Sequence, residues 1–103
     1  MNLQDHLQKD RIFYLKEDGK NQAIRELVEN TCRHVAGLDC RKTLQAVADR
    51  ESVVSSWVAP GIAIPHARLP NLKGFVVSLG ISREGIEYES GDGQPVYLLI
   101  LIL

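Results

Sequence analysis

The apolar run from Tyr97 to Leu103 restricts the fold of this chain more than any other segment. After the tyrosine, every residue in it is leucine or isoleucine. Such a run is far too short to cross a bilayer as a helix, which takes about 20 residues. A continuous apolar stretch of this length is typical of a strand buried on both faces of a sheet. We therefore expect a central strand over 96–103, covered on both faces, and no membrane insertion.

Two segments before this run have the apolar spacing of amphipathic helices. The first carries one apolar face, made of Ile24, Leu27, Val28, Thr31, Cys32 and Val35. Gly37 ends this pattern, and Asp39 is a suitable N-cap for a second helix. The second helix is expected to bury Leu44, Val47 and Ala48. It leads to Arg50 and then to a turn that contains Ser55 and Ser56.

Short segments of high β-propensity surround these helices. Residues 12–15 precede them, and residues 75–79 and 85–88 follow them, before a turn cluster at 91–95 and the final run. Helices followed by strands predict an α/β (α+β) chain with a mixed β-sheet flanked by helices. No linker or repeat divides the sequence, so we expect a single domain over 1–103.

Composition limits the classes of function. The 103 residues are 45% hydrophobic and 24% charged with a net charge of -1, as in an ordinary globular domain. The sequence has no basic stripe, so we expect no binding to nucleic acid. Cys32 and Cys40 have neither metal-ligand nor redox spacing, and the polar start has no apolar signal-peptide core. Both are expected to be free thiols in a cytoplasmic protein.

His66 is the strongest candidate for chemistry. It follows Pro65 at the end of Gly-Ile-Ala-Ile-Pro at 61–65. Proline fixes its own φ and disfavours helix at the preceding residue, so the imidazole is expected at the rigid end of a short strand. A neutral imidazole is a competent nucleophile toward phosphorus, and a hydrogen bond to its other nitrogen can fix the tautomer. A structural histidine in a loop is the alternative for an isolated Pro-His pair.

The other two histidines are weaker candidates for chemistry, and the sequence contains no pattern of metal ligands. His6 lies in a polar stretch and His34 near a helix end, and neither has a motif around it. A metal site would need a second imidazole or a carboxylate at ligand spacing from His66, which the sequence does not provide. We expect no metal and no cofactor.

Three segments follow one another as in the active-site region of a known family: Arg50-Glu51, Ser55-Ser56 and Gly61 to His66. Together they resemble the enzyme IIA domains of the bacterial phosphotransferase system, in the fructose/mannitol and nitrogen-regulatory class. The match continues on both sides, over 22–27 and 92–96. The resemblance implies an enzyme IIA-like sandwich. Because family members continue through further elements, it also implies that the chain is the N-terminal part of such a domain, with the C-terminal part missing.

The resemblance implies a phosphoryl carrier. His66 would accept phosphate from an HPr-type phosphocarrier and pass it to an enzyme IIB partner or keep it as a regulatory mark. On the family pattern Arg50 is the cation that faces the phosphate, Arg68 is a weaker candidate for that role, and Ser56 is a candidate hydroxyl donor. This is a phosphotransferase half-reaction if the chain is active. The alternative is a regulatory module that binds a target protein according to phosphorylation, or with no chemistry at all.

Two further features shape these expectations. Trp57 and Ala59 stand where glycine is common in the family, so the turn before the motif must be rebuilt. The indole has three possible roles, which are to shield the site, to face a partner, or to pack in the ordinary way. The aliphatic end of the chain would be costly to expose. We therefore expect a homo-oligomer in which residues 96–103 are buried inside the sheet or at a subunit contact.

Overall fold

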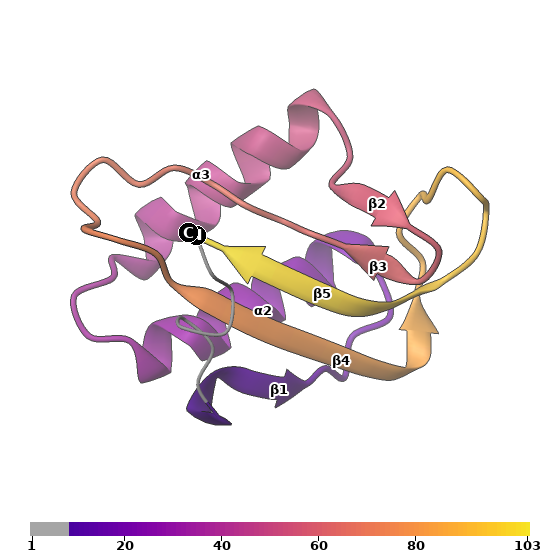
Figure 1. Cartoon of the computed structure of the whole chain (residues 1–103), viewed down its shortest axis with the longest axis horizontal. Coiled ribbons are helices and arrows are strands. Elements are labelled where there is room, and N and C mark those ends of the chain that lie inside the picture. Colours follow the sequence, from indigo (N-terminus) through magenta and orange to yellow (C-terminus); the bar gives the residue numbers. More distant parts are fainter. Residues whose placement is uncertain (1–8) are drawn as a thin grey trace.

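The computed structural model describes residues 9–103. Their centre is a five-stranded mixed sheet in the order β1-β4-β5-β3-β2 (Figure 1). The strands are β1 (Ile12–Tyr14), β2 (Trp57–Ala59), β3 (Ile62–Ala63), β4 (Val77–Ile86) and β5 (Val96–Ile102). β1 runs parallel to β4 and β3 runs parallel to β5, whereas β4 with β5 and β2 with β3 are antiparallel. The mixed sheet predicted from the sequence is confirmed.

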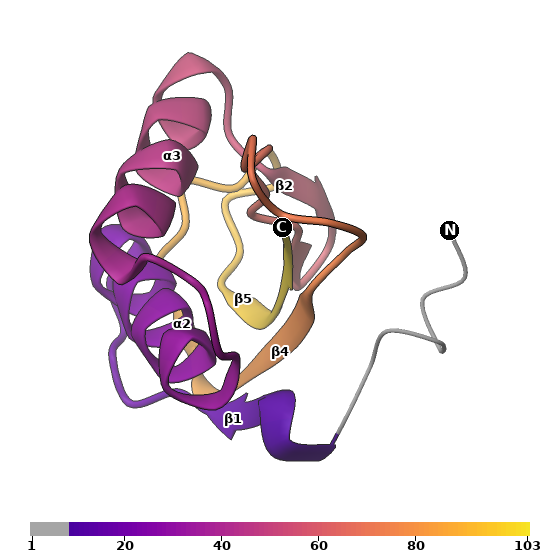
Figure 2. The same cartoon turned by 90° about the vertical axis from the view of Figure 1, so that its left-hand side faces the viewer.

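Helices α2 (Lys20–His34) and α3 (Cys40–Val53) lie on the same face of this sheet, as Figure 2 shows. A 3-10 turn, η1 (Lys9–Arg11), precedes β1. α2 approaches β4 closely at Gly80, because a Cβ there would lie 3.2 Å from the Leu27 side chain. Its buried face is made of Ala23, Ile24, Leu27, Val28 and Thr31. None of the helices that the structure describes is long and apolar enough to cross a membrane.

The helix ends follow the signals in the sequence. α2 ends at His34, and Gly37 in the next loop has a φ of 86°, a conformation that glycine adopts easily. Asp39 caps α3, because its side chain accepts a hydrogen bond from the Lys42 amide at 3.1 Å. The predicted stop and the predicted N-cap are both confirmed.

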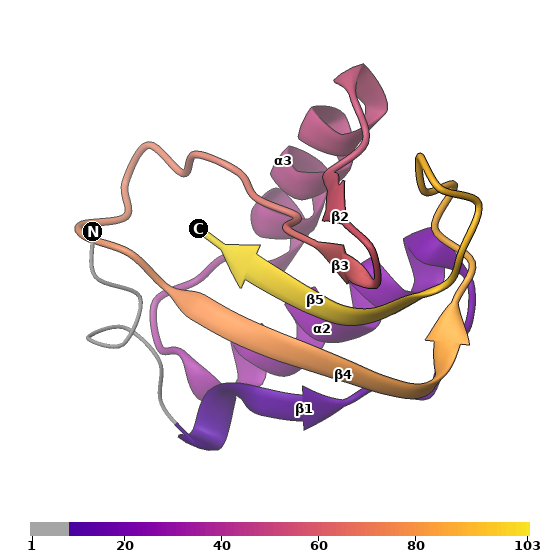
Figure 3. The ribbon, with the colours of Figure 1, turned by 45° about the vertical axis from the view of Figure 1, so that its right-hand side comes forward.

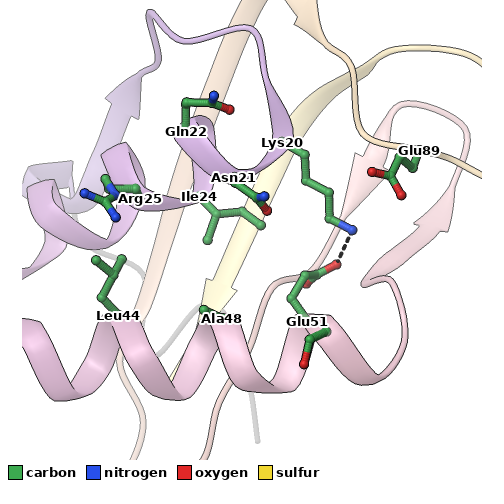
Figure 4. Close-up of a pocket in the computed structure, with 10 residues that line it drawn as sticks. Lys20, Asn21, Gln22, Ile24, Arg25, Leu44, Ala48, Glu51 and Glu89 are labelled. Atoms are coloured by element: carbon green, nitrogen blue, oxygen red, sulfur yellow. Dashed lines mark ion pairs between the residues drawn. The ribbon is translucent and has the colours of Figure 1, made fainter.

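The inner face of α3 differs from the prediction at one position. Val47 is fully buried and Leu44 is half buried, as expected, but Ala48 is exposed. Thr43, one turn before Val47, is 1% exposed and takes a place in the core. Ala48 instead lines a cavity of about 730 Å³ between α2 and α3 (Figure 4). Apolar spacing marks a helix face, but it does not show where the neighbouring helix leaves that face open.

β4 is one strand, although the sequence predicted two. Its pairing with β5 contains an irregularity between Ile81 and Ile86. There, Gly85 has a φ of 99° and its amide donates to Ser82 Oγ at 2.9 Å. A local bulge of this kind bends a strand without ending it. The polar residues 83–84 between the two apolar segments are therefore accommodated within the strand.

β5 is the central strand, as predicted, because it pairs with both β4 and β3. Leu99 and Leu101, on the helix side, are 0% exposed. Leu98, Ile100 and Ile102 alternate with them and are only half buried. The expectation that both faces are covered is wrong within residues 9–103, because α2 and α3 lie on the same side (Figure 2).

Candidate functional site

His66 lies just beyond β3, in a segment that continues alongside β5 (Figure 3). The Ile102 amide donates to the Pro65 carbonyl at 3.1 Å, and the Ala67 amide donates to the Ile102 carbonyl at 3.2 Å. These two hydrogen bonds bracket His66 and hold it beside Ile102. Pro65 itself is fully buried. The prediction that His66 stands at the end of a short strand is confirmed.

One nitrogen of the His66 imidazole is occupied by the main chain. Nδ1 lies 2.8 Å from the carbonyl oxygen of Ile64. A carbonyl oxygen only accepts hydrogen bonds, so Nδ1 carries the proton when the ring is neutral. Nε2 then holds the free lone pair and is the nucleophilic nitrogen. A main-chain carbonyl thus selects the tautomer.

A cavity of about 280 Å³ opens beside His66. Its walls come from the loop after β3 and from the end of β5, and they are mostly apolar: Ala67, Leu69, Leu72, Gly74, Phe75, Ile102 and Leu103. Arg68 also lines the cavity, and its side chain is exposed. Within residues 9–103, the walls of this cavity thus combine the His66 imidazole, the Arg68 guanidinium and apolar side chains.

Arg50 lies in the last turn of α3 and is half buried. Its Nη1 donates to the Val54 carbonyl at 3.4 Å, which is a long hydrogen bond. A guanidinium has five N–H donors, so this contact uses a small part of its capacity. The structure does not place Arg50 in the wall of the cavity beside His66, whereas Arg68 is part of that wall.

Ser56 is buried just before β2 and contacts the His66 motif through its main chain. Its carbonyl accepts a hydrogen bond from the Ile64 amide at 2.9 Å. Its amide donates to Glu51 Oε2 at 2.8 Å, and its Oγ lies 2.6 Å from the hydroxyl of Tyr88. Ser56 therefore joins α3, the segment after β4 and the strand that leads to His66, although it does not line the His66 cavity.

Lys20 and Tyr88 also lie near Ser56 and Glu51, although no pattern in the sequence marks them. Lys20 Nζ lies 3.0 Å from Glu51 Oε2 (Figure 4). The same nitrogen lies 5.0 Å from the centre of the Tyr88 ring. Burial is the main cause that raises the pKa of Tyr88 further above neutral pH, where the phenol is protonated in any case. No local motif marks these residues, because only the packing of α2, α3 and the sheet brings them together.

The turn before the motif is rebuilt as a hairpin between β2 and β3. Pro60 and Gly61 form its connection, and Gly61 has a φ of 76°. Proline followed by a glycine of positive φ is a combination typical of a type II turn. Trp57 is half buried and packs against Gly91, where a Cβ would lie 2.8 Å from the indole ring. This contact is ordinary packing, one of the three roles considered for Trp57, and the indole does not line the His66 cavity.

Among the described residues, Cys32, Cys40 and His34 do not line the His66 cavity. Cys32 and Cys40 are free, as predicted, and burial together with their mutual hydrogen bond raises the pKa of Cys32 to about 12. Nδ1 of His34 lies 2.9 Å from the Asn30 carbonyl. His6 lies outside the described residues. Within residues 9–103, no group of three histidine, cysteine or carboxylate side chains is placed to hold a metal ion.

Comparison with known proteins agrees with the resemblance seen in the sequence. The family described as "Phosphoenolpyruvate-dependent sugar phosphotransferase system, EIIA 2" matches residues 5–103. A nitrogen regulatory protein of Bradyrhizobium diazoefficiens is 35% identical over 89 residues, which cover 86% of this chain and 58% of that protein. The "PTS system fructose-specific EIIABC component" of Bacillus subtilis is 41% identical over 58 residues, or 56% of this chain and 9% of that protein. The chain thus spans less than two thirds of the length of these relatives.

Solved structures share the fold. The nitrogen regulatory protein IIA-Ntr from Neisseria meningitidis has a TM-score of 0.86 at 24% identity, covering 96% of this chain and 68% of that one. Enzyme IIAMTL from Escherichia coli, solved in complex with phosphorylated enzyme IIBMTL, has a TM-score of 0.79 at 23% identity, covering 93% and 68%. At such identities the likeness concerns the fold alone. The sequence match over 5–103 shows the family, and the chain belongs to the EIIA 2 family of the phosphoenolpyruvate-dependent sugar phosphotransferase system.

Proposed function

We propose that this chain is a phosphoryl carrier that accepts phosphate on Nε2 of His66 from an HPr-type phosphocarrier. The observation that carries this proposal is the 2.8 Å hydrogen bond between Nδ1 and the Ile64 carbonyl, which leaves Nε2 unprotonated in the neutral ring. Membership of the EIIA 2 family supports the same role. In this role residues 1–103 belong to a single domain of the enzyme IIA type.

The proposed transfer exchanges one N–P bond for another. Nε2 of His66 attacks the phosphorus, and the N–P bond of the donor's phosphohistidine breaks. The donor ring leaves as neutral imidazole when its other nitrogen carries a proton, and His66 becomes a phosphorylated imidazolium. Its Nδ1–H still donates to the Ile64 carbonyl, and this charge-assisted hydrogen bond stabilises the positive ring. An acceptor nucleophile then takes the phosphoryl group and returns His66 to the neutral form.

Arg50 and Ser56 are the proposed helpers. The transition state spreads negative charge over the equatorial oxygens, so a guanidinium and a hydroxyl stabilise it. The 3.4 Å contact with the Val54 carbonyl restrains Arg50 only weakly, which allows the guanidinium to turn toward a phosphate. When Tyr88 donates the proton in the pair of hydroxyls, the Ser56 O–H can donate to a phosphate oxygen.

An enzyme IIB protein is the acceptor that we propose. A protein of the same fold has been solved in complex with a phosphorylated enzyme IIB. The rim of the His66 cavity includes Leu69, Leu72 and Phe75, and Phe75 is 49% exposed. An apolar rim fits a protein surface, whereas the hydroxyls of a free sugar would lose their hydrogen bonds against it.

A regulatory binding role is the second candidate. The 35% identity to a nitrogen regulatory protein favours it. In addition, Trp57 and Ala59 remove backbone freedom from the turn before the motif, and Pro60 has no amide to offer to a phosphate. In this role the phosphate on His66 would alter the affinity for a target protein and would not leave for an enzyme IIB. Loss of phosphate from His66 after an enzyme IIB protein is added distinguishes the two roles.

We also propose that the protein works in the cytoplasm as a homo-oligomer. Free Cys32 and Cys40 fit a reducing compartment. The sheet face opposite the helices carries half-buried Leu98, Ile100 and Ile102. An apolar surface of this kind is a natural contact for a second copy of the chain.

Labelling by a phosphorylated HPr-type donor tests the carrier proposal. The parent should take up one acid-labile, base-stable phosphoryl group, and His66→Ala should take up none, because the nucleophile is absent. His34→Ala is the matched control, since that imidazole lies on α2 beside the Asn30 carbonyl, and it should be labelled like the parent. Equal labelling of His66→Ala and the parent would show that another residue is the acceptor.

A further inference from the structure

Four side chains form a buried polar cluster behind the strand that leads to His66, namely Lys20, Glu51, Ser56 and Tyr88. Ser56 and Tyr88 are 7% and 1% exposed. The side chains of Lys20 and Glu51 are 14% and 7% exposed. Polar groups in such surroundings are stable only when they are paired, and each of these four has a partner within the cluster.

Glu51 is the centre of the cluster. Its Oε2 lies 3.0 Å from the Lys20 ammonium and accepts a hydrogen bond from the Ser56 amide at 2.8 Å. Figure 4 shows the Lys20–Glu51 pair in the wall of the cavity between α2 and α3. A charged acceptor binds an amide more strongly than a neutral one does. The main chain at Ser56 is therefore fixed relative to the end of α3.

Hydrogen bonds continue from Ser56 to the imidazole. The Ser56 carbonyl accepts from the Ile64 amide at 2.9 Å, and the Ile64 carbonyl accepts from His66 Nδ1 at 2.8 Å. Both main-chain groups of Ile64 are therefore engaged. A displacement of Ser56 would move Ile64, and with it the carbonyl that selects the tautomer of His66.

We propose that Glu51, held by Lys20, is a positioning residue for His66 that acts through the main chain of Ser56 and Ile64. Glu51 lines the cavity between the helices and not the cavity beside His66, so its action needs no contact with phosphate. The effect on phosphoryl transfer rests on the proposed function, whereas the effect on the imidazole does not. The two effects can therefore be measured separately.

Nitrogen NMR of His66 tests the positioning directly. In the parent, the shifts of the neutral ring should report a proton on Nδ1. Glu51→Ala removes the acceptor of the Ser56 amide and should give a mixture of both tautomers, together with faster hydrogen exchange at the Ile64 amide. Glu51→Gln keeps an oxygen that can accept from Ser56 and should restore most of the parent spectrum. Glu89→Gln is the matched control, because it alters a carboxylate in the wall of the same cavity and should change nothing (Figure 4).

Transfer kinetics give the second readout. With a phosphorylated HPr-type donor, Glu51→Ala should lower the maximal rate about tenfold with little change in the donor concentration for half-saturation, because orientation is lost and docking is kept. If Glu51→Ala does not fold, Glu51→Asp serves instead, since it keeps the charge but withdraws it by one methylene. A parent-like tautomer in the folded variant would overturn the proposal. If the tautomer changes in Glu51→Ala but the parent itself takes up no phosphate, the positioning role is upheld and the carrier function is contradicted.

Discussion

A main-chain atom selects the tautomer of His66. Its Nδ1 lies 2.8 Å from the Ile64 carbonyl oxygen. A main-chain carbonyl does not titrate in the ordinary pH range, so it remains a hydrogen-bond acceptor throughout. The same carbonyl serves the neutral ring and the charged one, since Nδ1 donates in both forms. In the proposed phosphorylation cycle, this contact would keep the orientation of the imidazole while the charge of the ring changes.

Arg50→Ala should slow phosphorylation of His66 by roughly tenfold or more, because a charge-assisted contact is typically worth about 1.5–3 kcal/mol. The midpoint of thermal unfolding should stay near that of the parent, since the contact that Arg50 makes with the Val54 carbonyl is long, at 3.4 Å. Rapid-quench kinetics and calorimetry measure the two quantities.

Two other arginines serve as comparisons. Arg41→Ala changes an exposed side chain of the same helix and should leave the rate unchanged. Arg68→Ala alters the arginine that lines the His66 cavity. If Arg68→Ala slows phosphorylation of His66 and Arg50→Ala does not, the phosphate-facing cation is Arg68.

At the scale of elements, the β2–β3 hairpin supports the site. Gly61 is in its connection, and the Gly61 carbonyl accepts hydrogen bonds from the Tyr97 and Leu98 amides of β5 at 2.9 and 3.1 Å. The turn is therefore tied to the central strand at the end opposite His66, where Ile102 pairs with the same segment. This arrangement keeps β3 in register along β5.

Gly61→Ala should destabilise the protein by about 1–2 kcal/mol, because its φ of 76° places a side chain in the left-handed region. Gly61→Asn should destabilise the protein less than Gly61→Ala does, since asparagine adopts the left-handed region more readily. Chemical denaturation measures both free energies of unfolding. Equal stability of the alanine variant and the parent would show that the turn relaxes to another geometry.

At the scale of the whole molecule, one face of the sheet is open within residues 9–103. The helices cover the other face (Figure 2), whereas β5 presents alternate aliphatic side chains on the open one. Large apolar residues are also exposed elsewhere, among them Tyr14 at 60%, Val58 at 53% and Tyr97 at 46%. Full burial of an aliphatic side chain is worth about 1.5–3 kcal/mol. Association through this face would bury these side chains and is therefore favoured.

Sedimentation velocity of the 103-residue chain should show self-association. Ile100→Lys places a charge in the open face and should shift the distribution toward monomer. Val53→Lys is the control, because Val53 is 80% exposed at the end of α3, on the helix side of the sheet. A stable monomer at high concentration, with rapidly exchanging amides along β5, would contradict the prediction.

Local patterns in the sequence were enough to identify several parts of this protein. The spacing of apolar residues predicted α2, Asp39 predicted the start of α3, and the aliphatic run at 96–103 predicted the central strand. Pro65 and the residues around it placed His66 at a strand end and indicated the family. Each of these signals depends mainly on residues that are close to one another in the sequence, which is the range over which backbone sterics and helix capping act.

Only the tertiary structure showed which face of the sheet is covered and which side chains meet behind His66. An apolar strand indicates burial, but it does not say whether helices pack on one side or on both. Likewise, Glu51 gave no sign that it pairs with Lys20 and with the Ser56 amide, because those contacts join distant segments whose meeting depends on how α2 and α3 pack. The sequence by itself determined both helices and the central strand and singled out His66 as the candidate for chemistry, whereas long-range packing decided what holds that imidazole in place.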